Sequence, residues 1–198
     1  MLNTKQKRNW TVLFIGGASG TGKSSITYEL ARYYNVNVME ADDVFQAVQA
    51  MTTVETHPAT HHWSTGVDWL DIGVGGNVDW LINVSREIIP ALKAIAENHI
   101  ESGVPVIIEG DFINPEFTVS FDNPRVKSFF VKESDKNQIL QNYLAREGGE
   151  PQDYRAEISV AYDNRLSDIC EKSGIRMIEA RPWDTAVKRV IESMIINP

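Results

Sequence analysis

The sequence predicts an α/β domain in which a parallel sheet of five strands is covered by helices on both faces. Short apolar runs alternate with longer stretches of helical spacing along the whole chain, and this alternation is typical of parallel sheets with right-handed crossovers. The chain has 198 residues, of which 42% are apolar, and this is enough for one domain with a substantial core. We therefore expect residues 1–198 to form a single domain.

The first strand is expected at residues 11–15, because Thr-Val-Leu-Phe-Ile is a short apolar run followed by glycines, as in a strand buried on both faces. By the same criterion, the other strands are expected at residues 36–39, 104–108, 126–131 and 175–178. The helices are expected at residues 24–34, 44–51, 78–101, 136–146, 154–172 and 185–196, with Gly174 as a C-terminal stop. Pro90 should kink or split the helix that contains it.

Composition and charge exclude several classes of protein. The formal net charge is −8 and the pI is near 5.0, which argues against a nucleic-acid partner. Cys170 is the single cysteine, so no intramolecular disulfide forms. No apolar run is long enough to span a membrane, and residues 1–10 are polar and basic without the apolar segment of a secretory signal. We expect a cytoplasmic protein, and the composition leaves its oligomeric state open.

The strongest motif lies directly after the first expected strand. Residues 17–24 read Gly-Ala-Ser-Gly-Thr-Gly-Lys-Ser and match the phosphate-loop pattern G-x-x-x-x-G-K-[ST] between a strand and a helix. Glycines let backbone N–H groups surround phosphate oxygens, Lys23 reaches the β- and γ-phosphates, and the Ser24 hydroxyl binds Mg²⁺. ATP and Mg²⁺ are therefore the expected cofactors. The residues expected to bind ATP are Gly17, Ser19, Gly20, Thr21, Gly22, Lys23, Ser24, Ser25 and Arg146.

Acidic residues follow the second expected strand, in the run Glu40-Ala-Asp42-Asp43. Ligands of open α/β sheets bind at the carboxyl ends of the strands, where a carboxylate can accept the proton of an attacking hydroxyl. Asp43 directly precedes an expected helix, so an N-cap role is the alternative for this residue. We assign Asp42 as the base or hydroxyl ligand and keep Asp43 as the second candidate.

The third expected strand also ends in acids, Glu109-Gly110-Asp111. A carboxylate after a buried strand can hold Mg²⁺, usually through water, so Glu109 joins Ser24 as a metal-binding candidate. Gly110 allows a phosphate or a substrate to approach closely. The alternative is that Asp111 and Asn114 face the phosphate acceptor.

Arginines are expected to stabilise the charge of a transferring phosphoryl group. Arg146 precedes Gly148-Gly149, and the segment 146–156 resembles a mobile lid that closes over ATP. Arg155 and Arg165 are weaker candidates, and the alternatives are helix C-terminal charge for Arg146 and simple solvent exposure for Arg155. The backbone near Arg181-Pro182 is a candidate contact for adenine.

The segment 52–76 is too long for an ordinary connection, and inserts of this kind are usually functional or mobile. It contains Trp63 and three histidines, His57, His61 and His62. One interpretation is that its aromatic residues anchor a long loop on the core, and another is that Trp63 lines a substrate pocket. A zinc site is disfavoured, because the histidines lie in a loop without an evident third ligand. Together, the residues expected to bind substrate are Asp42, Asp43, Glu109, Asp111 and Trp63.

These motifs together resemble the small-molecule P-loop kinases, which include the gluconate and shikimate kinases, the chloramphenicol phosphotransferase and zeta-toxin group, and the 2-phosphoglycerate kinase group. Residues 108–115, Ile-Glu-Gly-Asp-Phe-Ile-Asn-Pro, are most similar to the last group. The resemblance implies a three-layer P-loop NTPase sandwich with strand order 2-3-1-4-5 and functional residues at Lys23, Ser24, Asp42 and Arg146. These families often place an arginine shortly after the acid of strand two, where this chain has Phe45-Gln46. This departure counts against an anionic acceptor bound in that way.

The sequence therefore predicts an ATP-dependent phosphotransferase that acts on a hydroxyl of a small molecule. One alternative is a nucleotide-dependent switch or regulatory ATPase, and another is a nucleotide or polynucleotide kinase, whose polynucleotide form the acidic pI disfavours. The guanine-reading motif Asn-Lys-x-Asp is absent from the sequence, which favours adenine as the base.

Overall fold

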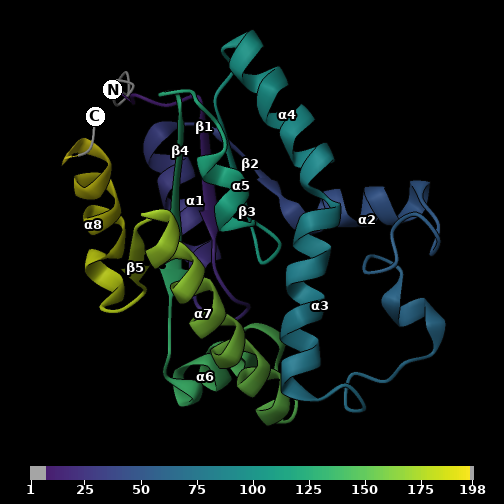
Figure 1. Cartoon of the computed structure of the whole chain (residues 1–198). Coiled ribbons are helices and arrows are strands. Elements are labelled where there is room, and N and C mark those ends of the chain that lie inside the picture. The colour runs from purple at the N-terminus through teal and green to yellow at the C-terminus, as the bar shows by residue number, and fades with distance from the viewer. Residues whose placement is uncertain (1–7, 197–198) are drawn as a thin grey trace.

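The computed structural model describes residues 8–196, which are arranged around one parallel sheet with the strand order β2-β3-β1-β4-β5 (Figure 1). Most of the segment predicted to carry no secretory signal, residues 1–7, lies outside the described residues. The strands are β1 (Val12–Gly16), β2 (Asn37–Glu40), β3 (Val106–Gly110), β4 (Val126–Lys132) and β5 (Met177–Glu179). The predicted fold class and strand order are confirmed.

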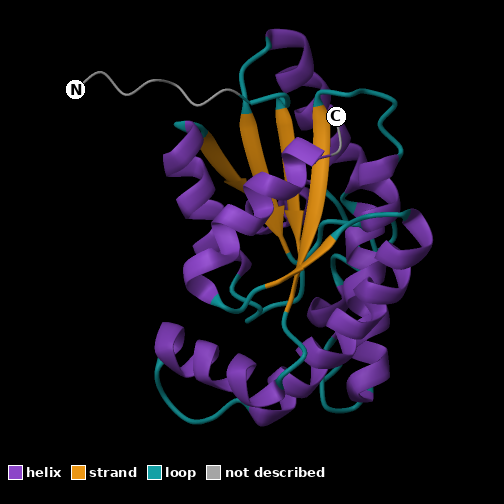
Figure 2. Cartoon of the chain, turned by 90° about the vertical axis from the view of Figure 1, so that its left-hand side faces the viewer, coloured by secondary structure: helices purple, strands orange, loops and turns teal. Residues whose placement is uncertain are grey.

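Helices cover both faces of the sheet, as Figure 2 shows. The helices are α1 (Lys23–Tyr34), α2 (Ala41–Met51), α3 (Gly73–Glu87), α4 (Ile89–Ser102), α5 (Pro115–Val119), α6 (Lys136–Glu147), α7 (Asp153–Ser173) and α8 (Trp183–Ile196), with a short 3₁₀ helix at His62–Thr65. Alternate residues of β1 point to opposite faces. Leu13 and Ile15 pack in the core beneath α1 and α8, whereas Val12 and Phe14 pack in the core beneath α3, α4, α5 and α7. Among the described residues, no helix combines the length and apolar character that crossing a membrane requires.

The long helix predicted around Pro90 is split in two, as expected. Helix α3 ends at Glu87, and Ile88 separates it from α4. Pro90 lies in the first turn of α4, where its missing N–H leaves no helical hydrogen bond unmade. The proline therefore begins a new helix instead of kinking an old one.

Helix α2 begins earlier than predicted, and this changes the position of the acids after β2. Asp42 and Asp43 lie in its first turn, where they interact favourably with the helix dipole. Glu40 occupies the N-cap position, so the interpretation of Asp43 as an N-cap was wrong. Strand β3 begins at Val106 and ends at Gly110, so both ends lie two residues later than predicted. Glu109 and Gly110 are therefore the last two residues of the strand and do not follow it.

Asp163 on α7 is fully buried, and this makes the stability of the fold depend on pH. Burial raises the pKa of its carboxyl to about 7, against the opposing effect of the Lys132 charge. The unfolded chain ionises this group near its ordinary pKa of about 4, so the folded state binds the extra proton between those values. The free energy of unfolding should therefore fall as pH rises from about 4 through 7.

The variant Asp163→Asn should lose this pH dependence, because the amide does not ionise. At pH 8 we expect Asp163→Asn to be more stable than the native protein by up to about 4 kcal/mol, with a much smaller difference at pH 4. Urea unfolding across this pH range measures it, with Asp168→Asn on the exposed side of α7 as the control. Parallel stability curves for the native protein and Asp163→Asn would contradict the assignment.

Candidate active site

The phosphate loop lies between β1 and α1, in the structural context that its sequence pattern predicts. Gly17 adopts a φ of 146°, and a Cβ there would lie 2.5 Å from the carbonyl oxygen of Val131, so only glycine fits. The Thr21 hydroxyl donates to the Ala18 carbonyl at 2.9 Å, and the Asn142 amide donates to the Gly20 carbonyl at 2.7 Å. These contacts hold the loop in a curved shape at the N-terminus of α1, which favours anions.

Lys23 is buried at the start of α1, and its ammonium group forms an ion pair with Asp111. Burial lowers the pKa of Lys23, but the negative charges of Asp111 and Glu109 outweigh burial, and the net shift is upward. Lys23 therefore remains charged at neutral pH. The same ammonium group is the one expected to reach the terminal phosphates of ATP.

Ser24 and Glu109 fit the proposed Mg²⁺ site. The Ser24 hydroxyl donates to Glu109 Oε1 at 3.2 Å, and Glu109 Oε2 is buried without a hydrogen-bond partner among the described residues. Burial and the nearby charge of Asp111 raise the pKa of Glu109, although Lys23 opposes the shift. A cation beside Glu109 would compensate this buried carboxylate, and a hydroxyl with a carboxylate is a ligand set that suits Mg²⁺.

The two acids at the start of α2 have different surroundings. Asp42 lies near Lys23 and Asp111, and its pKa is raised by desolvation first and by the charge of Asp111 second, against the effect of Lys23. Asp43 lines a separate, largely apolar hollow between α2 and α4. The geometry therefore favours Asp42 over Asp43 as the acid that faces the phosphate loop.

A pocket of about 430 Å³ lies beside the phosphate loop, between α1, α6 and α8. Gly22, Ser24, Ser25 and Arg146 line it, as the sequence predicts for residues that bind ATP. Trp183 also lines it, and its indole ring lies so close to Gly22 that a Cβ there would be 2.3 Å from the ring. Sequence reasoning missed Trp183, although the available signal was an aromatic residue directly after the predicted adenine contact.

The predicted lid arginines lie on two different sides of the phosphate loop. Arg146 lines the pocket just described, and Arg155 lines a second pocket. Glu147 pairs with both, at 2.5 Å from Arg146 Nη2 and 2.8 Å from Arg155 Nη1. Arg165 lies elsewhere on α7, 4.0 Å from Asp79, and is not brought to the phosphate loop. Gly148 and Gly149 both have positive φ in the turn between α6 and α7.

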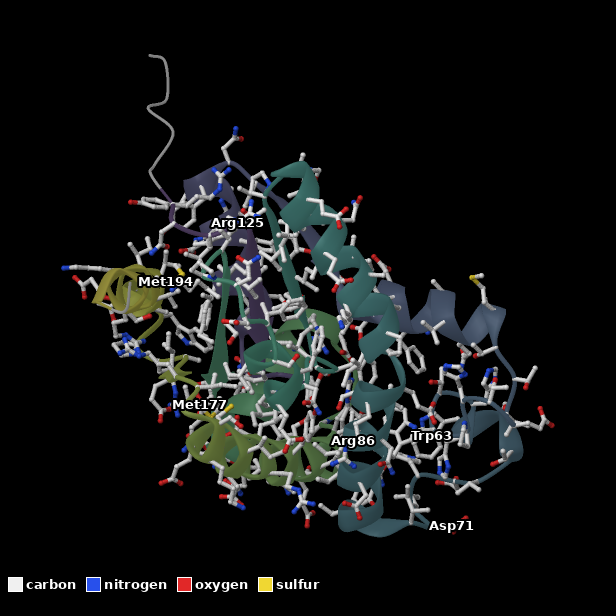
Figure 3. All side chains as sticks on the ribbon, turned by 45° about the horizontal axis from the view of Figure 1, so that its top comes forward. Trp63, Asp71, Arg86, Arg125, Met177 and Met194 are labelled. Carbon is white, nitrogen blue, oxygen red and sulfur yellow. The ribbon has the colours of Figure 1, made fainter. Side chains whose placement is uncertain are left out.

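The second pocket has a volume of about 570 Å³ and opens onto the phosphate loop at Ser19 and Asp111. Trp63, Trp69 and Trp80 line this pocket, and we call it the tryptophan pocket. Figure 3 shows Trp63 on the insert, on the opposite side of the molecule from Met194 of α8. Trp63 lines this pocket, which is consistent with the prediction that it lines a pocket for the substrate.

The insert is also anchored on the core, as the alternative interpretation held. Glu87 of α3 accepts hydrogen bonds from the backbone N–H groups of Ala59 and Thr60 at 2.9 and 2.8 Å, and the Trp80 indole N–H donates to the Ala59 carbonyl at 2.9 Å. Within residues 8–194, no group of three histidines, cysteines or acids is placed to hold a metal.

Two further sequence-derived candidates have structural partners. Asn114 is buried, caps α5 by accepting from the Phe117 N–H at 3.0 Å, and donates to the Ser85 hydroxyl. We therefore assign Asn114 to the fold and not to the acceptor site. Arg181 pairs with Glu133 at 2.6 Å, which directs its side chain toward β4 and leaves Trp183 as the side chain from this region in the pocket.

In sheet order, phosphate loop and the acids at the carboxyl ends of β2 and β3, the chain is similar to the small-molecule P-loop kinases, and the predicted resemblance is confirmed. In sequence, the chain is similar to two proteins named 2-phosphoglycerate kinase. It is 30% identical to the protein of Pyrococcus horikoshii over 188 residues, which are 91% of this chain and 60% of the relative. It is 26% identical to that of Methanothermobacter thermautotrophicus over 150 residues, which are 72% of this chain and 49% of the relative.

In structure, the chain superimposes on a gluconokinase from Sinorhizobium meliloti with a TM-score of 0.54 and 14% identity, covering 96% of this chain and 94% of the other. At this identity, the likeness shows the fold alone. The chain spans about half to three fifths of the length of the curated relatives it matches. No protein-family model matches it.

Proposed function

We propose that this protein transfers the γ-phosphate of Mg²⁺-ATP to a hydroxyl group of a small molecule. The observation that carries the proposal is the arrangement of two pockets around one phosphate loop. Ser24 and Arg146 face one pocket, Asp111 faces the other, and Lys23 lies between them in its ion pair with Asp111. A donor nucleotide and an acceptor would therefore meet at Lys23.

Each residue has a defined part in the proposed transfer. The acceptor hydroxyl oxygen forms a bond to the γ-phosphorus, the bond from that phosphorus to the ADP oxygen breaks, and Asp42 takes the hydroxyl proton. Lys23 and Arg146 stabilise the charge on the phosphate oxygens. Ser24 and Glu109 would hold Mg²⁺, which neutralises phosphate charge when it is bound. Asp111 and Trp63 are proposed on the acceptor side, whereas Asp43 lines the separate hollow against α4.

The position of Trp183 gives a prediction for the nucleotide. We expect the adenine ring to stack on this indole, because the ring lies at the pocket wall next to the phosphate loop. Trp183→Ala should weaken ATP binding by about tenfold or more, since stacking of a base on an aromatic side chain contributes roughly 1–3 kcal/mol. Titration with ATP by calorimetry measures the change, and Trp69→Ala, on the other pocket, is the matched control. Equal ATP affinity in Trp183→Ala and the native protein would place adenine elsewhere.

The test of the proposed function is ADP release with Mg²⁺-ATP in the presence of sugars, sugar acids, nucleosides, amino alcohols and aminoglycosides. We expect one class to stimulate ADP release strongly, and the stimulation to be lost in Asp42→Asn. Tight nucleotide binding with slow turnover that no compound stimulates would favour the nucleotide-dependent switch instead.

A further inference from the structure

If the proposed function holds, the side chains that line the tryptophan pocket determine which kind of acceptor binds there. It lies between the insert, α3 and α7, and reaches the phosphate loop at Ser19 and Asp111. An acceptor bound there would place one end beside the Lys23–Asp111 pair. The walls of the pocket therefore contact the remainder of the acceptor.

Aromatic side chains that contact one another form much of the walls. Trp63 and Trp80 have ring centroids 4.8 Å apart, and Trp80 lies 6.0 Å from Phe112. Phe112 stacks in turn on Phe45, at 5.1 Å. Phe45 of α2 thus supports Phe112 in this wall.

Three polar side chains of the walls already hydrogen-bond within the protein. The Tyr143 hydroxyl bonds to the Ser159 hydroxyl at 2.7 Å, and the Tyr162 hydroxyl donates to the Asp111 carbonyl at 2.8 Å. The Asn77 amide donates to the Trp69 carbonyl at 2.7 Å. These groups are less available to an acceptor with many hydroxyls, and aromatic side chains are the main apolar feature that the pocket offers.

The charges in the pocket disfavour an anion. Among the residues that the structure describes, the acids and bases that line it are Asp68, Asp111 and Arg155. Asp111 pairs with Lys23, and Arg155 pairs with Glu147 at 2.8 Å and lies 4.3 Å from the centre of the Tyr143 ring. An anionic acceptor would have to take Arg155 from an existing partner and then lie near additional carboxylates.

From these observations we propose that the acceptor is an uncharged alcohol with an aromatic or similarly flat apolar ring, bound against the tryptophans with its hydroxyl toward the phosphate loop. The proposal separates this chain from what the name of its 2-phosphoglycerate kinase relatives states, because that substrate is small, anionic and without a ring. The aromatic wall formed by Trp63, Trp80 and Phe112 is the feature that favours a ring-containing acceptor over 2-phosphoglycerate.

Two ligand sets test the proposal with the full chain. The first contains 2-phenylethanol and 4-hydroxybenzyl alcohol, and the second contains 2-phosphoglycerate, glycerate and gluconate. Saturation-transfer NMR without nucleotide measures binding, and mass spectrometry after incubation with Mg²⁺-ATP measures phosphorylated product. We expect the ring protons of the first set to receive saturation, with little transfer to the second set, and the phosphorylated product to come from the first set.

The variant Trp63→Ala should weaken binding of the aromatic alcohols by roughly 10- to 100-fold, the loss that follows from removing one large aromatic contact. Val54→Ala, an apolar truncation at an exposed position of the same insert, is the control and should bind them normally. Binding of 2-phosphoglycerate in preference to the aromatic alcohols would overturn the proposal. So would aromatic binding that Trp63→Ala leaves unchanged. Aromatic binding without any phosphorylated product would instead contradict the proposed function and leave the pocket assignment standing.

Discussion

Lys23→Ala is expected to lower kcat/KM for ATP by about 10³-fold, because it removes the buried ammonium group at the end of the phosphate loop that pairs with Asp111. Losing a single preorganised charge contact to a transition state typically costs 10²–10³ in rate, and the lysine of a phosphate loop also contributes to nucleotide binding. Lys23 is buried and pairs with Asp111, so the variant also leaves that carboxylate without its partner. The expected loss therefore appears both in kcat and in the affinity for ATP.

Steady-state kinetics with the acceptor that most stimulates ADP release measure this effect. Lys93→Ala, which removes an exposed lysine of α4, is the control and should retain full activity. Thermal unfolding shows whether Lys23→Ala remains folded, and Ser24→Ala provides a second change in the same loop with a smaller alteration of charge. Turnover of ATP at the native rate in a folded Lys23→Ala variant would contradict the assignment of the phosphate loop.

Asp42→Asn is expected to slow phosphoryl transfer by about 10² or more while ATP binding remains close to native, the scale at which general bases contribute. The asparagine keeps the size of the side chain and cannot take the hydroxyl proton. Desolvation and the charge of Asp111 raise the pKa of Asp42, so the native rate should increase with pH as this carboxyl ionises. The variant should lose that acidic limb of the pH profile.

Asp43→Asn is the matched control, because it changes the neighbouring acid in the same turn of α2. We expect a small effect, since Asp43 lines the hollow against α4 and not the phosphate loop. Single-turnover measurements separate transfer from product release in both variants. If Asp43→Asn abolished the acidic limb and Asp42→Asn kept it, the roles of the two acids would have to be exchanged. If Asp111→Asn abolished the acidic limb and Asp42→Asn kept it, the proton transfer would be assigned to Asp111, the acid of the tryptophan pocket.

Much of the fold could be predicted because its signals are local. The apolar run of β1, the phosphate-loop pattern and Pro90 each act within a few residues, and all three were located correctly. The boundary of β3 was misplaced because Val104 is as apolar as the strand, although it is half exposed beyond the end of α4. Helix α5 was missed although Asn114-Pro115 is a sound start signal, because its five residues are too few for a periodic pattern.

The parts of the site that could not be predicted depend on contacts between distant residues. The pairing of Lys23 with Asp111 joins positions 88 apart in the chain, and no local pattern indicates it. Trp183 lies against Gly22 only because α8 packs beside α1. Likewise, the insert forms a pocket wall only once Trp63 meets Trp80 of α3. The sequence contained these residues, but their grouping is a property of the tertiary structure.

Transfer of phosphate to a small molecule is tested most directly by tracing the γ-phosphate of ATP. The protein is incubated with Mg²⁺ and ATP labelled at the γ-position, with and without the acceptor candidates, and the label is traced by chromatography. We expect the label to appear in a phosphorylated small molecule in equal amount to the ADP formed, and Asp42→Asn to slow the formation of both greatly. Label found only in inorganic phosphate, at a rate that no acceptor changes, would contradict the account and indicate an ATPase.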